Sequence, residues 1–404
     1  MIHYVRFMPE MFRRLAEDIT VSRRDFLRVF LPLLNTLTWF YVCMSAAIQV
    51  VSAETGGNLH LISLLNVFAA LSAVVSGVVR LRLRGLANDL LILLEGFLTA
   101  LIPLSIHLRV SALPLCYALS FMLGWELPGC FSLFGRQTRI EERGRIACFA
   151  FIPILFATFL VRLAFTSLEM ILLAMAVWRL LYIPIFRFVG LPTTWRAEEP
   201  RRVFPMTVTL SYLSSWFMFG AIDRYSLLAI THTHGLNILN FMRTLSLCAG
   251  VVGALIGGFI VDLLGRRPSS LLGFVGLGIA YTLLSINPHG IGHLIVYSVL
   301  DGLTWGLLTL TYTFVVWGDL SPKRPVMERY YALGFAAYLL SSIPVDLLGE
   351  VLVEIPLNMA FSVSAFFLFL AVLPLWSAPE TVPSEVFEHR RLRAYIRKAK
   401  RMKF

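Results

Sequence analysis

Twelve stretches of the sequence are long enough and apolar enough to cross a lipid bilayer. A spanning helix needs about 20 apolar residues, because each residue adds about 1.5 Å and the hydrocarbon core is about 30 Å thick. The chain has 404 residues, 58% of them hydrophobic and 15% charged, with a mean hydropathy of +0.77. A water-soluble protein of this length cannot bury so much apolar surface. The expected spans cover 29–51, 60–79, 87–107, 111–134, 146–164, 167–186, 205–228, 236–260, 269–286, 291–317, 329–349 and 354–376.

Positive charge is distributed unevenly around these spans. The net charge is +11, and all but five of the 35 Lys and Arg residues fall in the tails or in loops that follow even-numbered spans. Lys and Arg are retained on the cytoplasmic side of membrane proteins. We therefore expect both termini to be cytoplasmic in the cell membrane, with the basic C-terminal tail on anionic headgroups and no nucleic-acid partner. The five exceptions are Arg109, Arg162, Arg179, Arg224 and Arg243.

The chain is consistent with two copies of a six-span unit. After its fourth span, each copy has a glycine, a charged loop and a Glu-Arg pair that opens the next span. The two pairs, Glu142-Arg143 and Glu328-Arg329, lie close to half a chain apart. Parallel repeats of this kind place a substrate path between the halves, near the bilayer midplane. The expected segments are a basic cytoplasmic segment at 1–28, an N-terminal six-helix half at 29–187, a cytoplasmic linker at 188–204, a C-terminal six-helix half at 205–378 and a basic cytoplasmic tail at 379–404.

A short polar stretch, G-G-F-I-V-D-L-L-G-R-R-P, separates spans eight and nine. Its spacing, Gly258-x-x-x-Asp262-x-x-Gly265-Arg266-Arg267, resembles the signature loop of the major facilitator superfamily, which implies a gating role. Gly258 would let two helices approach closely, and Gly265 would permit a tight turn. Asp262, at a helix end, can accept hydrogen bonds from the amino terminus of a neighbouring helix. We expect Arg266 and Arg267 to anchor the loop at the lipid headgroups.

The resemblance covers roughly residues 29–380 and implies a fold class and a function. The implied fold is an all-α membrane protein with twelve transmembrane helices in two six-helix halves related by pseudo-symmetry. The implied function is secondary active transport of a small solute by alternating access, without a cofactor. Two segments agree with the family, E-R-G-R at 142–145 and P-E-T at 379–381, the latter resembling the close of sugar porters. Two residues depart from it, since Leu81 replaces an acid in the first-half loop and Leu263 replaces a base in the second.

In this superfamily the first, fourth, seventh and tenth spans line a central cavity, and this chain has one tryptophan near the middle of each. Tryptophan normally prefers the headgroup region, so these four are unusual. In span ten, polar and aromatic residues recur at i, i+4, i+8 and i+11, on one stripe of a helix, and span seven has a similar stripe. Such a surface suits an uncharged or cationic ligand, although helix packing uses the same residue types. The candidate cavity residues are Asn35, Trp39, Trp125, Tyr212, Trp216, Asp223, Trp305, Thr309 and Tyr312.

Glu126 and Asp301 are the candidate proton-coupling residues. Each is an acid in a span expected to line the cavity, and a charge at mid-bilayer depth costs about 2.5–3.5 kcal/mol on insertion scales. Burial favours the protonated form of a carboxylic acid, so either side chain can carry a coupling H+. Arg179 and Arg243 are their possible partners, or structural counter-ions of Glu95 and Asp301. Coupling by sodium, uniport without a coupling ion, and a purely structural role for both acids remain open.

Other classes of protein fit the sequence less well. A non-transporting receptor or scaffold on the same fold is one alternative, and a polytopic membrane enzyme is another. The enzyme would need a catalytic motif such as H-E-x-x-H, which the sequence lacks, so we expect no catalytic residues. The cysteines have no metal-binding spacing, and we expect a monomer without a metal. We interpret six histidines of the expected outer face as solvated loop residues rather than metal ligands. They are His60, His107, His232, His234, His289 and His293.

Overall fold

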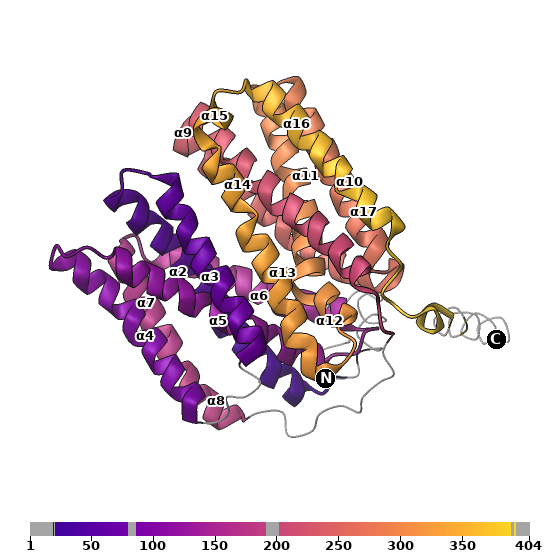
Figure 1. Ribbon diagram of the computed structural model, residues 1–404, viewed down its shortest axis with the longest axis horizontal. Helices are drawn as coiled ribbons and strands as arrows, with labels where there is room; N and C mark the ends of the chain where they lie inside the picture. The colour runs from indigo at the N-terminus through magenta and orange to yellow at the C-terminus, as the bar shows by residue number, and fades with distance from the viewer. Residues whose placement is uncertain (1–18, 20, 80–85, 191–201, 389–391, 393–404) are drawn as a thin grey trace, which may run out of the picture.

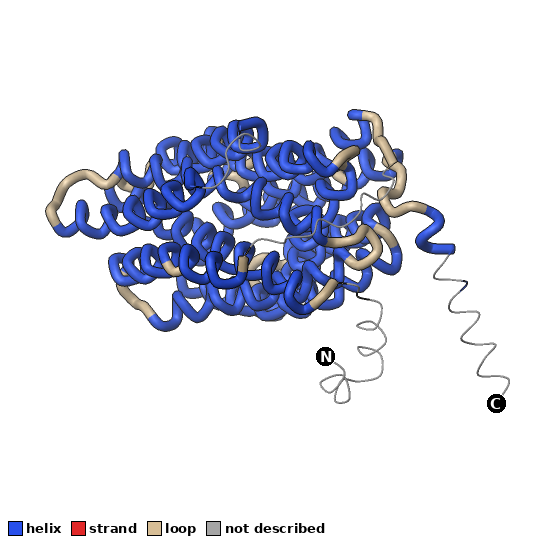
Figure 2. Tube along the Cα trace, turned by 90° about the horizontal axis from the view of Figure 1, so that it is seen from below, coloured by secondary structure: helices blue, strands red, loops and turns tan. Residues whose placement is uncertain are grey.

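The part of the chain that the computed structural model describes is mostly helical, with loops and turns between the helices and without a strand (Figures 1 and 2). By length and composition, nine helical segments in this part are able to cross a membrane. These features confirm the predicted all-α, multi-pass fold class. Leu81 and most of the expected segments 1–28, 188–204 and 379–404 lie outside the described residues. The described residues are 19, 21–79, 86–190, 202–388 and 392.

The helices of the N-terminal part begin where the sequence supplies capping groups. Ser22 precedes the first described helix, and its hydroxyl accepts a hydrogen bond of 3.1 Å from the backbone N–H of Asp25. Ser167 caps another helix in the same way through the N–H of Met170. Such caps satisfy donors that have no partner within the helix. The helices are α2 (Arg23–Glu54), α3 (Leu59–Val79), α4 (Leu86–His107), α5 (Leu113–Gln137), α6 (Arg143–Ala164), α7 (Leu168–Leu180) and α8 (Tyr182–Val189).

The helices of the C-terminal part are more often interrupted. Span ten passes from an α-helix through a π-helical segment, a form that occurs frequently at functional sites. Spans eleven and twelve are each broken into shorter helices that follow one another directly. The elements are α9 (Met206–Leu264), α10 (Arg266–Ile286), α11 (Ile291–Leu310), η3 (Thr311–Val316), α12 (Trp317–Leu320), η4 (Arg324–Val326), α13 (Met327–Leu340), α14 (Ser342–Leu347), α15 (Gly349–Val353), α16 (Leu357–Leu370) and α17 (Val372–Ser377).

The long helix α9 contains predicted spans seven and eight together with the turn that joins them. It is helical along its whole length, so the prediction of a loop carrying His232 and His234 was wrong. In a straight helix Asp223 and Ser246 would be about 35 Å apart. Both line the same cavity, so the chain reverses its direction between them while remaining helical.

The helices form two neighbouring groups. In Figure 1, α2 to α5, α7 and α8 lie on the left, and α10, α11, α13, α16 and α17 lie on the right. Across the boundary, α3 packs against α13, and α6 packs against α9. These contacts place the first and second parts of the chain side by side, as expected for two halves. The exact segment bounds given by the sequence stay a prediction.

Candidate functional site

A cavity of about 280 Å³ lies between the two arms of α9 and the helix α11. Asp301 follows Ile291, the first residue of α11, by ten positions, which is about 15 Å along a helix. The span continues to Leu320, so this distance places Asp301 well inside a hydrocarbon core of about 30 Å. The cavity therefore lies inside the bilayer, as expected for a substrate path. Its lining residues all belong to the second part of the chain, whereas the sequence placed the path between the two halves. The residues of its wall that carry charge or aromatic polar groups are Asp223, Arg243, Tyr297, Asp301 and Trp305, with Ser246 beside them.

Two hydroxyl groups contact the carboxylate of Asp301. The Ser246 hydroxyl donates a hydrogen bond of 2.7 Å to one carboxylate oxygen, and the Tyr297 hydroxyl lies 3.5 Å from the other. Of the predicted site residues, Asp223, Asp301 and Trp305 line this cavity together. Sequence reasoning missed Ser246 and Tyr297. The position of Tyr297, four residues before Asp301 on the same helical face, was a usable signal.

The second predicted proton-coupling acid, Glu126, belongs to a different cluster, inside the N-terminal part. Arg179 is fully buried there. Its guanidinium lies 2.6 Å from the Glu95 carboxylate and 3.4 Å from that of Glu126. Two carboxylates thus share one guanidinium at membrane depth. The sequence had suggested the Glu95–Arg179 pair as a counter-ion pair, and the structure brings the two residues together.

Two predicted cavity residues, Asn35 and Trp39, also belong to this cluster. Arg179 donates a hydrogen bond of 2.7 Å to the side-chain oxygen of Asn35 and one of 3.1 Å to the hydroxyl of Thr36. The guanidinium carbon lies 4.7 Å from the centre of the Trp39 ring, within cation–π range. Trp39 donates its indole N–H to the hydroxyl of Thr99 at 3.2 Å.

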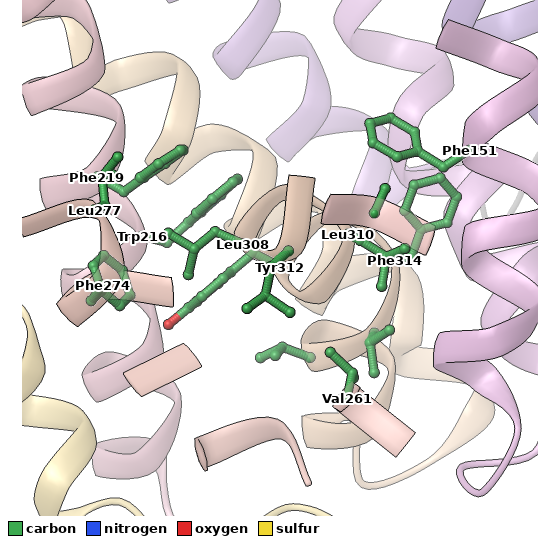
Figure 3. Packing of buried hydrophobic residues seen from close by; sticks show 14 of the residues in the cluster. Phe151, Trp216, Phe219, Val261, Phe274, Leu277, Leu308, Leu310, Tyr312 and Phe314 are labelled. Carbon is green, nitrogen blue, oxygen red and sulfur yellow. The ribbon is translucent and has the colours of Figure 1, made fainter. Parts of the chain in front are cut away.

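Other predicted cavity residues lie in aromatic packing. Trp216 and Tyr312 stack in parallel with ring centres 4.8 Å apart (Figure 3). Tyr212 is fully buried, with its ring centre 6.1 Å from that of Tyr312, and Thr309 is buried nearby. Trp125 stacks on Phe121. None of these six residues lines the cavity at Asp301. Their role in substrate binding stays a prediction.

A buried network of charges surrounds Asp262 at the predicted cytoplasmic end of the helices. One carboxylate oxygen of Asp262 accepts the backbone N–H of Gly144 at 2.9 Å. The other accepts the backbone N–H of Arg145 at 3.0 Å and its side-chain Nε at 3.1 Å. Gly144 and Arg145 open α6, so Asp262 binds the amino terminus of a neighbouring helix, as the sequence suggested. Its gating role stays a prediction.

Arg266 extends this network and corrects one prediction. The sequence suggested that it lies among lipid headgroups, but its side chain is fully buried. It contacts Asp262 at 3.1 Å and Asp319 at 2.7 Å, and it donates to the carbonyl of Ile140. Asp319 also accepts a hydrogen bond from Arg143. We call Arg143, Arg145, Asp262, Arg266 and Asp319 the inner network.

The inner network includes groups that sequence reasoning did not select. Asp319 precedes the second Glu-Arg pair, in the segment W-G-D-L-S-P, where the sequence suggests a charged loop, but it is buried between two arginines. Glu380 accepts the backbone N–H groups of Arg266 at 2.8 Å and Arg267 at 3.0 Å, which caps the start of α10. Glu380 belongs to the P-E-T segment at 379–381, and this motif was the sequence feature from which its role could have been predicted.

Two glycines of the signature loop have the geometry expected of them. Gly265 has φ +105°, a backbone conformation that favours glycine. A Cβ atom on Gly258 would lie 2.7 Å from the Cβ of Cys148 and 2.7 Å from the carbonyl oxygen of Gly144. Only a residue without a side chain lets α9 and α6 approach so closely.

Two histidines contact each other at the predicted outer end. The rings of His234 and His289 have their centres 5.2 Å apart, and Nε2 of His234 lies 3.1 Å from the Pro288 carbonyl oxygen. Burial of the ring and the nearby His289 lower the pKa of His234. Among the described residues, no group of three or more His, Cys, Asp or Glu side chains is arranged to hold a metal ion.

The fold is similar to those of solved membrane transporters. The proton:xylose symporter XylE of the major facilitator superfamily, bound to 6-bromo-6-deoxy-D-glucose, matches with a TM-score of 0.68 and 12% identity over 89% of this chain and 97% of XylE. A double-tryptophan variant of XylE matches with a TM-score of 0.64 and 14% identity over 92% and 99%. The human organic anion transporter MFSD10 (TETRAN) matches with a TM-score of 0.63 and 14% identity over 87% and 99%. The sequence itself matches no protein-family model and no curated protein.

Proposed function

Because the chain has the fold of the major facilitator superfamily, we propose that it is a secondary active transporter that moves a small solute by alternating access. The observation that carries this proposal is the cavity at Asp301, ten residues into the span Ile291–Leu320 and lined by two half-buried carboxylates and a guanidinium. Charged groups at this depth are costly and mark substrate and ion paths in membrane proteins. Folds built from repeats place such paths near the midplane, between the repeats. This cavity is formed by the second part of the chain, and its Trp305 faces the first part, with its ring centre 6.4 Å from that of Phe151.

The inner network supports a gate at the predicted cytoplasmic end. Asp262 belongs to the end of α9, and its partners Gly144 and Arg145 belong to the start of α6. These contacts join the first part of the chain to the second, and the Arg143–Asp319 ion pair does the same. Opening a path to the cytoplasm would require these contacts to separate. We expect Asp262→Asn to slow transport and to leave equilibrium binding of the solute nearly intact, since Asp262 is outside the cavity.

H+ is the coupling ion in this proposal, and Asp301 and Glu126 are its candidate carriers. Asp301 is bound by hydroxyl groups rather than by an arginine in the described part of the chain, so protonation costs it no ion pair. Glu126 shares Arg179 with Glu95. One of these two carboxylates can accept a proton while the other keeps the ion pair.

We place the protein in the cell membrane as a monomer, with both termini in the cytoplasm. The positive-inside distribution of Lys and Arg supports this orientation. A cysteine introduced at the exposed residue Asn58 should react with a membrane-impermeant maleimide from outside intact cells. A cysteine at the exposed residue Lys323 should react only after the membrane is opened. Reaction of either cysteine from the other side would refute the orientation.

Solute flux into proteoliposomes tests the proposed function. The probes are radiolabelled D-xylose, because XylE is named as a proton:xylose symporter, the cation benzyltrimethylammonium, and the anion p-aminohippurate, because MFSD10 is named as an organic anion transporter. We expect one class to enter faster than into protein-free liposomes and to respond to a pH gradient. If no class crosses faster than the protein-free rate, the transporter proposal fails and a receptor or scaffold role replaces it.

A further inference from the structure

We propose that the cavity between α9 and α11 binds a small organic cation, with its charged nitrogen between Asp223 and Asp301. This inference rests on the proposed transport function and gives it a substrate class. It is carried by three properties of the cavity, which are its charge balance, the order of side chains on α11, and its size and apolar wall.

The charge balance favours a cation. The cavity wall contains two carboxylates, Asp223 and Asp301, and one guanidinium, Arg243. Arg224, next to Asp223 in the chain, does not line the cavity, and its Nε is paired with Asp346 at 2.8 Å. An uncompensated negative charge in a membrane interior is unfavourable. When both carboxylates are ionised, one monovalent cation makes the charges of the wall balance, whereas an anion would add to the excess.

The order of side chains on α11 provides a binding surface for that cation. Tyr297, Asp301 and Trp305 are spaced at i, i+4 and i+8, so they lie on one face of the helix, and all three line the cavity. An acid therefore lies between two aromatic rings. Aromatic faces attract cations, most strongly for tryptophan, and a carboxylate supplies the ionic partner. This combination is typical of sites for amines and quaternary ammonium groups.

The volume of the cavity and its apolar side chains limit the size and the polarity of the rest of the ligand. At about 280 Å³ the cavity is just below the range of about 300–1,000 Å³ that drug-sized ligands occupy. Its other lining side chains are mostly apolar, and a sugar would leave several hydroxyl groups against them without partners. A compact amine with one aromatic or branched aliphatic group fits this wall better. The apolar residues are Leu227, Ile230, Leu239, Met242 and Leu247.

Calorimetric titration of the purified full-length protein in lipid nanodiscs with benzyltrimethylammonium tests the inference. This probe carries a permanent charge, so its ionisation does not change with pH. We expect saturable binding, and at least about tenfold weaker binding of D-xylose and of neopentylbenzene, the uncharged counterpart of the probe. Equal affinity for neopentylbenzene would overturn the inference, because the negative charges would then contribute nothing.

Variants locate the site. Asp301→Asn and Asp223→Asn should each weaken binding by about tenfold or more, since each removes a charge-assisted contact. Trp305→Leu should weaken it, and Trp305→Phe, which keeps a ring, should weaken it less. Glu350→Gln is the matched control, because Glu350 is an exposed acid on α15 outside the cavity. Unchanged affinity in Asp301→Asn, Asp223→Asn and Trp305→Leu, with unfolding midpoints like the wild type, would overturn the inference.

The flux measurement separates this inference from the proposed function. Transport of D-xylose or p-aminohippurate without binding of benzyltrimethylammonium would overturn the cation site and leave the transporter proposal intact. Binding of benzyltrimethylammonium that depends on Asp301, with no flux of any probe, would support the cation site and contradict transport.

Discussion

Arg179 is fully buried, and its guanidinium contacts two carboxylates, two uncharged side-chain oxygens and the face of Trp39. A guanidinium has five N–H groups in a planar fork, so it can satisfy several acceptors at once. Within a bilayer no water is present to replace a lost partner. The contacts of Arg179 therefore determine whether Glu95 and Glu126 are tolerated at this depth.

Removing the Arg179 guanidinium should destabilise the protein strongly. We expect Arg179→Met to lower the free energy of unfolding by about 3–5 kcal/mol, because it leaves buried carboxylates without their cation. Chemical unfolding in mixed detergent micelles, followed by circular dichroism, measures this change. Adding Glu95→Gln to Arg179→Met should restore part of the loss, since it removes one of those charges.

An exposed ion pair provides the matched control. Arg187 on α8 lies 2.8 Å from Asp89 on α4, and its side chain is 70% exposed. Exposed pairs contribute about 0–1 kcal/mol, so Arg187→Met should change stability within that range. A similar loss of unfolding free energy in Arg179→Met and Arg187→Met would show that the buried cluster stabilises the protein no more than an exposed ion pair does.

His234 should make stability depend on pH at the predicted outer end. Its pKa is lowered by burial and by His289, so the unfolded chain takes up the proton more readily. The neutral contact therefore contributes stability above a pH of about 6.5, and the protein loses it as the pH falls from that value through the lower pKa of the folded state. The unfolding midpoint of the wild type should fall more between about pH 7.5 and about pH 5.5 than that of His234→Gln. His60→Gln, which changes an exposed histidine, should follow the wild type, and a parallel fall in all three proteins would contradict this role.

At the scale of elements, the contact of α6 with α9 depends on the absence of a side chain at Gly258. A Cβ there would overlap with Cys148 and Gly144 at distances that real Cβ atoms essentially never show. The same contact orients Asp262 toward the first turn of α6. Close packing and the hydrogen bonds of the inner network therefore depend on each other.

Gly258→Val should separate α6 from α9 at the predicted cytoplasmic end. Cys148 is fully buried in this contact, so we expect its modification by N-ethylmaleimide to rise several-fold in the variant. Mass spectrometry of the labelled protein identifies the site. The buried residues Cys43 and Cys116 lie in a different packing cluster and should remain unmodified, which distinguishes local opening from general unfolding.

Gly292→Val is the control for this change. A Cβ on Gly292 would meet no atom within 4 Å, so the added side chain has space. It should leave the modification of Cys148 at the wild-type level. An unmodified Cys148 in Gly258→Val as well would show that α6 and α9 tolerate the side chain without separating.

For the whole molecule, the sequence predicted the features that follow from local composition. Twenty-residue apolar runs give spanning helices in any context, so the all-helical fold could be predicted. The signature loop also predicted the contact between Asp262 and a helix amino terminus. Both depend on short stretches of sequence that behave alike in many proteins.

Features that depend on pairing between distant segments were not predictable in the same way. Arg266 was expected at the headgroups, and it is buried because Asp319, 53 residues further along the chain, supplies a partner in addition to the neighbouring Asp262. The stripe on span ten was expected to line one cavity, but it leaves the cavity after Trp305, so that Thr309 and Tyr312 do not line it. Asp301 and Trp305 line the cavity, whereas Tyr312 stacks on Trp216. Periodicity identifies a helical face and does not identify what that face contacts.

Proton coupling at the cavity is tested most directly by comparing pH-driven accumulation with counterflow in the same proteoliposomes, using the solute that the flux probes identify. The wild type should accumulate the solute along a pH gradient and also exchange it. Asp301→Asn should lose accumulation and keep counterflow when the solute is supplied at saturating concentration, since exchange requires no net movement of protons. A structural acid would instead lose both activities together. If Asp301→Asn and Glu126→Gln both accumulate the solute at the wild-type level in response to the pH gradient, neither acid carries the coupling proton.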